Sequence, residues 1–195
     1  MLFRSNTYLT GYLPLFSILL FSLTFSVYGV EVFVDLFKKI GIYPGMREFL
    51  SDLELKFILL IFLMIVCFMV FAALKLIAET INEVSLLFFS QDNEGEILHK
   101  VRSGSMVYFI GALVSVVSLR SFLGLLLIFL VTSIAYFVYF IYKISPSLTK
   151  PGLLGVIFFQ VITWSSLFLI VFLVVLKLYN GLLASLPIIS EVKLN

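Results

Sequence analysis

The sequence predicts an all-α fold: a membrane-embedded helical bundle of five transmembrane helices, with amphipathic helical extensions outside the bilayer. Its composition is 62% hydrophobic and only 12% charged, with a mean hydropathy of +1.20. A soluble domain is about half apolar and about a quarter charged. The apolar residues also form blocks that reach the roughly 20 residues a membrane-spanning helix needs. We therefore treat residues 1–195 as a single integral membrane domain.

Charge and cysteine content exclude several classes of protein. The 13 basic and 11 acidic residues give a net charge of +2, with no basic run, so a nucleic-acid partner is not expected. The chain has one Cys, Cys67, and one His, which rules out an internal disulfide and any Cys/His metal cluster. Cys67 is best explained as a small apolar side chain. We expect no cofactor, and the first expected partner is the lipid bilayer.

The first predicted span covers residues 9–30. Pro14 lies near its start, where a missing backbone donor costs least. The apolar run is long for a cleaved signal peptide, and Val27-Tyr28-Gly29 is a poor cleavage site, so we expect the segment to be retained.

Residues 31–56 show an amphipathic pattern on both sides of the turn GIYPG at 41–45. Before the turn, apolar residues fall on one helical face and charged residues on another; the apolar ones are Val32, Phe33, Leu36, Phe37 and Ile40. After it, the pattern resumes from Met46 to Glu54. We expect two short helices that either lie in the membrane interface or extend the spans as a helical hairpin.

The second predicted span covers residues 57–74, and its helical pattern continues to about Ser90. In that continuation Lys75, Glu79, Asn82 and Glu83 lie opposite an apolar stripe, so we expect the helix to emerge from the membrane. The polar stretch at 91–96 is the clearest loop. The fifth predicted span, residues 153–176, follows a breaker-rich segment at 143–152.

Between these spans, Arg120 is the only charge in the apolar run 106–141. As one helix those 36 residues would measure about 54 Å, against an apolar bilayer core about 30 Å thick. A charge near the middle would cost roughly 3 kcal/mol or more. We therefore predict two spans, 104–119 and 122–142, with Arg120 at a helical-hairpin corner on the membrane interface. A re-entrant segment is the alternative.

Five spans place the two termini on opposite sides of the membrane, but they leave the orientation open. The basic residues divide into six on one side, namely Arg4, Lys75, Lys100, Arg102, Lys143 and Lys150, and seven on the other, namely Lys38, Lys39, Arg47, Lys56, Arg120, Lys177 and Lys193. The positive-inside rule needs a clear excess on one side.

Apart from Arg120, the five predicted spans contain no Asp, Glu, Lys, Arg or His. Proton-coupled transport usually needs a titratable group at depth, and intramembrane enzymes need a metal-ligating motif or a nucleophile with its base. No HExxH, GxSxG, GxGxxG or P-loop motif occurs. We predict no catalytic residue and expect the protein not to be an enzyme.

Small and polar residues instead follow the spans at spacings of four and three. The positions of greatest interest are Ser115 in the third span, Thr132 and Tyr136 in the fourth, and Gln160 and Thr163 in the fifth. Such spacing places a set of residues along one seam of a helix pair, which favours close helix packing. The alternative is a polar path or pocket within the bundle. Gln160 in particular needs a hydrogen-bond partner at that depth.

Four stretches spread over the chain resemble a family of uncharacterised Bacillus-type multi-pass membrane proteins, the YufK-like family. They are NTYLTGY at 6–12, GMREF at 45–49, SLLFFS at 85–90 and LLASLP at 182–187. The resemblance implies a plasma-membrane protein of a Gram-positive bacterium. It implies no activity, cofactor or functional residue.

Two functions follow as expectations. The first is a non-enzymatic interaction or accessory protein, whose partner is another membrane protein or a second copy of itself. The lack of titratable groups in the spans, beside two well-patterned amphipathic stretches, favours it. The alternative is a small channel or carrier for an ion or neutral solute, in which the polar stripes face a common cavity.

Overall fold

The computed structural model describes residues 7–90 and 101–185, and within them every regular element is helical. The α-helices are α1 (Thr7–Lys39), α2 (Tyr43–Phe49), α3 (Asp52–Phe89), α5 (Ser105–Ser115), α6 (Phe122–Ile144) and α7 (Lys150–Ser185). Three short 3₁₀ turns join them: η1 (Arg102–Gly104), η2 (Val116–Ser118) and η3 (Ser145–Ser147). The all-α prediction is confirmed.

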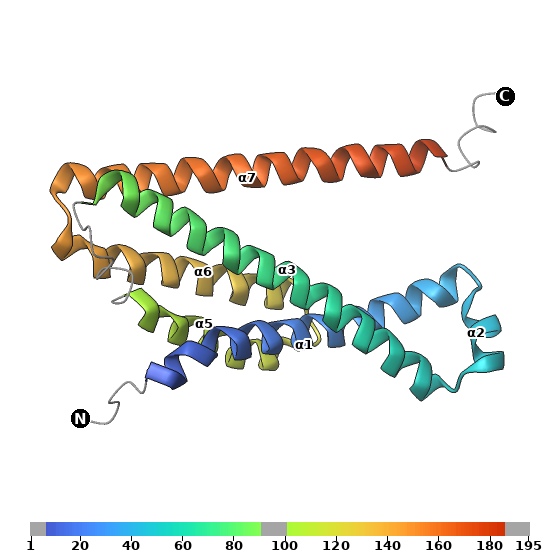
Figure 1. Ribbon diagram of the computed structural model, residues 1–195. Helices are drawn as coiled ribbons and strands as arrows, with labels where there is room; N and C mark the ends of the chain where they lie inside the picture. Colours follow the sequence, from blue (N-terminus) through green and yellow to red (C-terminus); the bar gives the residue numbers. More distant parts are fainter. Residues whose placement is uncertain (1–6, 91–100, 186–195) are drawn as a thin grey trace.

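Four of these helical segments are long and apolar enough to cross a membrane: Gly11–Lys39, Asp52–Phe89, Phe122–Ser147 and Lys150–Gly181. The apolar segment Ser105–Ser118 is shorter. Helices α1, α3, α5 and α6 pack into a bundle, and α7 joins it through contacts with α3 and α6. Figure 1 shows α1 and α3 projecting beyond the α5–α6 pair to meet at α2, while the second half of α7 leaves the bundle.

The first helix does not end where the first span was predicted to end. It continues to Lys39, so residues 31–39 extend it as one arm of a helical hairpin. Gly41 then ends the helical path with a φ of +76°, a conformation that glycine adopts at little cost. Pro44 lies in the first turn of α2, where no backbone donor is needed.

The amphipathic pattern of residues 46–54 predicted one helix, and the structure breaks it at Leu50 and Ser51. The side chain of Ser51 accepts a hydrogen bond from the backbone N–H of Glu54, and the Glu54 carboxylate accepts one from the backbone N–H of Ser51. This capping box starts α3. The signal was present in the sequence as Ser-x-x-Glu before an apolar run, and periodicity alone overlooked it.

Helix α3 has 38 residues, or about 57 Å of helix. Its second half was predicted to emerge from the membrane with Asn82 on its polar side, and the structure buries Asn82 and the residues around it against other helices. Ile81, Asn82, Ser85 and Leu86 are buried, and Leu86 belongs to a core with Phe140 of α6 and Val156 of α7. These contacts place residues 81–86 inside the bundle.

The chain turns at Leu119 and Arg120 and enters α6 at Phe122. The hydroxyl of Ser121 caps the new helix by accepting a hydrogen bond from the N–H of Gly124 at 3.1 Å. Arg120 is exposed at this corner. At the other end of the chain, α7 passes Lys177 without a break and reaches Ser185. The loop predicted at 91–96 and residues 186–195 lie outside the described residues.

Candidate functional site

A cluster of polar side chains joins three helices inside the bundle. Gln160 of α7, which is 2% exposed, donates from Nε2 to Oδ1 of Asn82 on α3 at 2.6 Å. Asn82 donates in turn from Nδ2 to the hydroxyl of Tyr136 on α6 at 3.4 Å. Thus the amide predicted to need a partner has one 78 residues away.

The cluster continues between α5 and α6. The ring of Tyr136 lies 5.1 Å from that of Tyr108, centroid to centroid, and the hydroxyl of Tyr108 donates to Oγ of Ser133 at 3.3 Å. We call these five residues the polar cluster: Asn82, Tyr108, Ser133, Tyr136 and Gln160. It holds two of the sequence-predicted positions, Tyr136 and Gln160.

The other predicted positions lie in separate contacts. Thr132 faces Gly111, where a Cβ would collide with its side chain, so α5 and α6 touch there. Ser115 is fully buried and shares a hydrogen bond with Thr24 of α1, at 3.1 Å between the two hydroxyls. Thr163 is half-buried on α7, one turn from Gln160. The five residues therefore do not face one common space.

Hydroxyl groups buried elsewhere in the bundle are satisfied by their own helices. Ser17, Ser22 and Ser26 of α1 each donate to the carbonyl four residues earlier, at 2.5 to 2.8 Å. Within the described residues, no buried side-chain nitrogen or oxygen lacks a hydrogen-bond partner. The small residues and hydroxyls thus allow close helix approach at no cost in unpaired polar groups.

Two surface pockets of the described chain lie away from the polar cluster. One, of about 250 Å³, is lined by Phe89 and the turn around η3; the other, of about 410 Å³, lies against Val174, Lys177, Leu178 and Gly181 of α7. Both are open to the surface, and neither contains a residue of the cluster. The arrangement around Asn82 is one of direct contact between side chains.

The polar cluster itself contains amides and hydroxyls, and it holds no carboxylate, imidazole or amine. Across the described ranges, no three His, Cys, Asp or Glu side chains lie where they could share a metal ion. Of the charged residues near the cluster on α3, Glu83 is exposed, and Glu79 pairs with Lys75 at 2.7 Å on a partly exposed face. The chemistry available in the cluster is hydrogen bonding between helices.

Sequence reasoning missed Asn82, which was assigned to the solvent-facing side of α3. A signal for its burial was present, because Ala78, Asn82, Ser85 and Phe89 follow the same spacing of four, three and four that marks the other packing seams. The charged residues around it, Glu79 and Glu83, concealed that stripe. Thr24 was missed too, because it stands outside the stripe that its neighbours Ser22 and Ser26 form.

These features define the class of protein: an α-helical bundle with several membrane-length apolar helices, which an internal polar cluster joins by hydrogen bonds. The chain belongs to a family of unknown function, DUF5366, which it matches over residues 30–187. The uncharacterized membrane protein YufK of Bacillus subtilis (strain 168) is 39% identical over 183 residues, covering 94% of this chain and 99% of that protein. The family resemblance read from the sequence is confirmed. No solved structure matches the chain significantly.

Proposed function

We propose that this protein is a five-span plasma-membrane protein that acts without catalysis, as an accessory protein that binds another protein or a second copy of itself. The polar cluster is the observation that carries the proposal. Its amides and hydroxyls bond to one another across α3, α5, α6 and α7, so they are not available to a substrate or an ion. Large apolar side chains remain uncovered elsewhere, on the projecting ends of α1 and α3 and along α7.

In this proposal the five spans are α1, α3, the segment Ser105–Ser118, α6 and α7. The segment Ser105–Ser118 is the short one, since 14 residues of helix measure about 21 Å. Thinning of the bilayer and the reach of the Arg120 side chain toward the headgroups compensate for that length. The relative of similar length in a Bacillus species supports the plasma membrane as the location.

A channel or carrier would need the polar stripes to line one space. The contacts instead divide them: Ser115 faces Thr24, Thr132 faces Gly111, and Gln160 faces Asn82. No contact among the described residues favours the transport alternative over packing.

The test is to extract the tagged full chain from its host membranes in a mild detergent and to identify what accompanies it. We expect a stoichiometric partner, either a different protein or an untagged copy of the chain. A homogeneous 22.1-kDa single chain with nothing bound would contradict the proposal. Flux of ions or small neutral solutes into vesicles that contain only the purified protein would support the channel instead.

A further inference from the structure

Two contacts with α6 fix the level of α3 in the bundle. The ring of Phe71 lies 5.2 Å from that of Phe129, centroid to centroid. Farther along α3, the Asn82 amide donates to the hydroxyl of Tyr136. Residues 71 and 82 of α3 are therefore level with residues 129 and 136 of α6.

These levels can be measured along α6 from the Arg120 corner. Phe129 and Tyr136 lie about 10 Å and about 21 Å from the start of that helix. In the five-span arrangement, on which this inference rests, α6 begins at the corner and crosses an apolar core about 30 Å thick. Residues 71–82 of α3 therefore occupy the middle third of the core.

This level brings charged residues of α3 into the bilayer. Lys75 and Glu79 lie within residues 71–82, and Glu83 follows directly. Lys75 and Glu79 pair with each other at 2.7 Å, whereas Glu83 makes no ion pair within the part of the chain that the structure describes. Charges at such depth are costly and usually mark a functional contact.

Moving the membrane toward the hairpin that α1 and α3 form with α2 would add charges to its core. The ring of Phe122 lies 5.8 Å from that of Tyr28, so the corner is level with Tyr28 on α1. A shift of about 10 Å would therefore enclose Glu31, one helical turn beyond Tyr28, and Arg120 as well. Lys75, about 15 Å inside the corner, would remain in the core.

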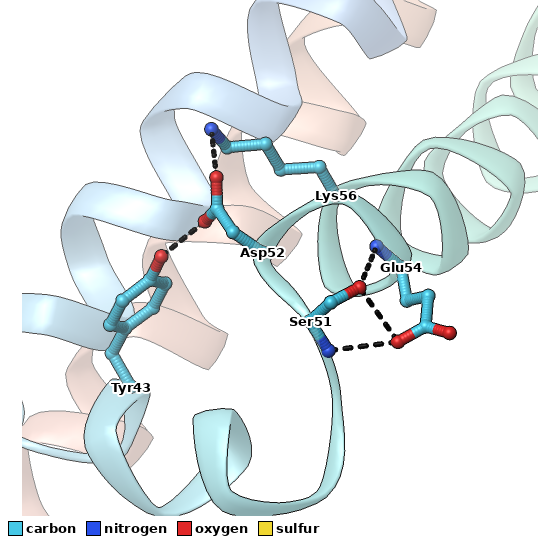
Figure 2. A network of polar contacts seen from close by, with 5 residues as sticks. All are labelled: Tyr43, Ser51, Asp52, Glu54 and Lys56. Carbon is cyan, nitrogen blue, oxygen red and sulfur yellow. Dashed lines mark hydrogen bonds and ion pairs between the residues drawn. The ribbon is translucent and has the colours of Figure 1, made fainter.

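The tip of the hairpin, residues 40–56, is suited to water or to the headgroup layer. Tyr43 donates from its hydroxyl to Asp52, and Lys56 bonds to the other carboxylate oxygen of Asp52 at 2.8 Å (Figure 2). Lys38 of α1 lies over the ring of Tyr43, 5.3 Å from its centroid. A tip with this many charged groups favours a membrane that ends near the Arg120 corner.

The side of α3 that faces away from the bundle has the pattern of a helix-packing seam. Four exposed residues follow spacings of four, three and four: Leu76, Thr80, Glu83 and Leu87. Glu79 lies beside them, with its side chain 49% exposed. Lipid chains cover leucine side chains well, but they offer no hydrogen bond and no counter-charge to a carboxylate. The polar centre of the seam therefore requires a different neighbour.

We propose that this face of α3 binds a membrane-spanning helix of a different protein, and that a lysine or arginine of that helix pairs with Glu83. Apolar side chains of the partner would pack against Leu76 and Leu87, and the basic side chain would supply the missing counter-charge. The inference rests on the proposed function and specifies the chemistry of its partner.

A second copy of the chain does not fit this face. Two copies related by a two-fold axis along the membrane normal would set their α3 helices side by side and parallel. Glu83 of one copy would then lie next to Glu83 of the other, and like charges in contact oppose association. Lys75 does not relieve this repulsion, because it is paired with Glu79 of its own helix.

The first experiment tests the depth of the seam in the full chain carrying Cys67→Ser, within its membranes. We expect Thr80→Cys to be protected from an impermeant maleimide on both sides, as Ile134→Cys should be. Ile134 is the matched control, because it is 63% exposed and lies about 18 Å along α6 from the corner. Gly45→Cys, at the tip, should react. Labelling of Thr80→Cys as fast as that of Gly45→Cys overturns the placement.

The second experiment introduces photoreactive benzoylphenylalanine at position 80 of the tagged full chain, or at position 134 as the control. We expect illumination of the membranes to give one adduct with a different protein from position 80 and little from position 134. Glu83→Lys should lower the adduct about tenfold or more, since it sets two cations against each other, whereas Glu83→Asp should retain it.

A charge swap controls for damage to the fold by Glu83→Lys. Replacing the basic residue of the partner's helix with glutamate should restore the adduct to Glu83→Lys. Failure of this rescue, an adduct that Glu83→Lys leaves unchanged, or an adduct with a second copy overturns the inference. A protein that co-purifies with the chain but does not cross-link at position 80 also overturns it, and leaves the proposed function standing. Absence of any co-purifying partner contradicts the proposed function itself.

Discussion

At the scale of single residues, the interior of this protein is defined by a few polar side chains that sit where apolar ones would be expected. A buried amide such as Gln160 costs several kcal/mol in an apolar environment unless it is hydrogen-bonded, on the order of 2–7 kcal/mol. The sequence therefore predicts that Gln160 has a partner. It does not identify Asn82, because the two residues are 78 positions apart and meet only after α3 and α7 pack.

Replacing Gln160 tests the energetic role of the polar cluster. Gln160→Leu leaves Oδ1 of Asn82 without its donor, and we expect a loss of about 1 kcal/mol in unfolding free energy, the scale of a hydrogen bond between membrane helices. Thermal unfolding in detergent measures it. The double variant Asn82→Leu/Gln160→Leu should lose less than the sum of the two single changes, since it leaves no amide unpaired. Strict additivity would mean that the two amides do not interact.

Gly111 gives a second prediction, about close approach of helices. Gly111→Ala should destabilise the bundle by about 1–3 kcal/mol, because the added methyl group overlaps the side chain of Thr132. Gly11→Ala is the matched control: it makes the same change in a helix where nothing lies within 4 Å, so we expect no loss. The comparison of the two unfolding temperatures decides the matter, and equal values would argue against a tight α5–α6 contact.

At the scale of elements, local signals explain where helices begin and long-range contacts explain how far they go. The capping box at Ser51 and Glu54, the glycine turn at Gly41 and the Ser121 cap are all visible in the sequence. The sequence does not reveal that the inner face of α3 is buried beyond Leu74. The charged outer face gives residues 75–89 the composition of a solvent-facing helix. The contact with α6 and α7 overrides that composition.

The hairpin tip should depend on pH in a defined direction. The hydrogen bond from Lys56 and then that from Tyr43 hold the pKa of Asp52 below its ordinary value, and the Ser51 contacts do the same for the pKa of Glu54. A carboxylate with a lowered pKa stabilises the fold above its unfolded pKa, about 4, and loses this effect as the pH falls through the folded value. The tip should therefore loosen below about pH 4.

Hydrogen exchange over residues 43–56, corrected for the intrinsic rate, measures this loosening. The variant Asp52→Asn/Glu54→Gln should show raised exchange already at neutral pH and little further change on acidification. At the alkaline end the sign reverses. The bond to Asp52 raises the pKa of Tyr43, so its contribution is complete below about pH 10 and is lost as the pH rises through the raised value. A tip that exchanges equally fast from pH 3 to pH 7 would contradict the role of Asp52.

At the scale of the whole molecule, the position of the Arg120 corner relative to the membrane decides the number of crossings. A corner at the membrane surface gives five spans, and a corner within the membrane gives a re-entrant segment. In the Cys67→Ser background, we expect Gly45→Cys and Ser121→Cys to react with an impermeant maleimide on one side of the membrane, and Ser147→Cys to react on the other. Each crossing reverses the side, so this pattern is that of five spans. Protection of Ser121→Cys from both sides would instead indicate a re-entrant α5–α6 segment.

The sequence by itself determined that this protein is helical, rich in membrane-length segments and free of catalytic motifs. It also located the corner at Arg120, because bilayer thickness and the cost of a buried charge constrain any chain of this composition. Only the tertiary structure decided which polar residues meet. It joined Gln160 to Asn82, and it turned residues 31–57 into a hairpin with an uncovered apolar surface. Periodicity identifies the faces of a helix, but which face meets which depends on contacts between helices far apart in the chain.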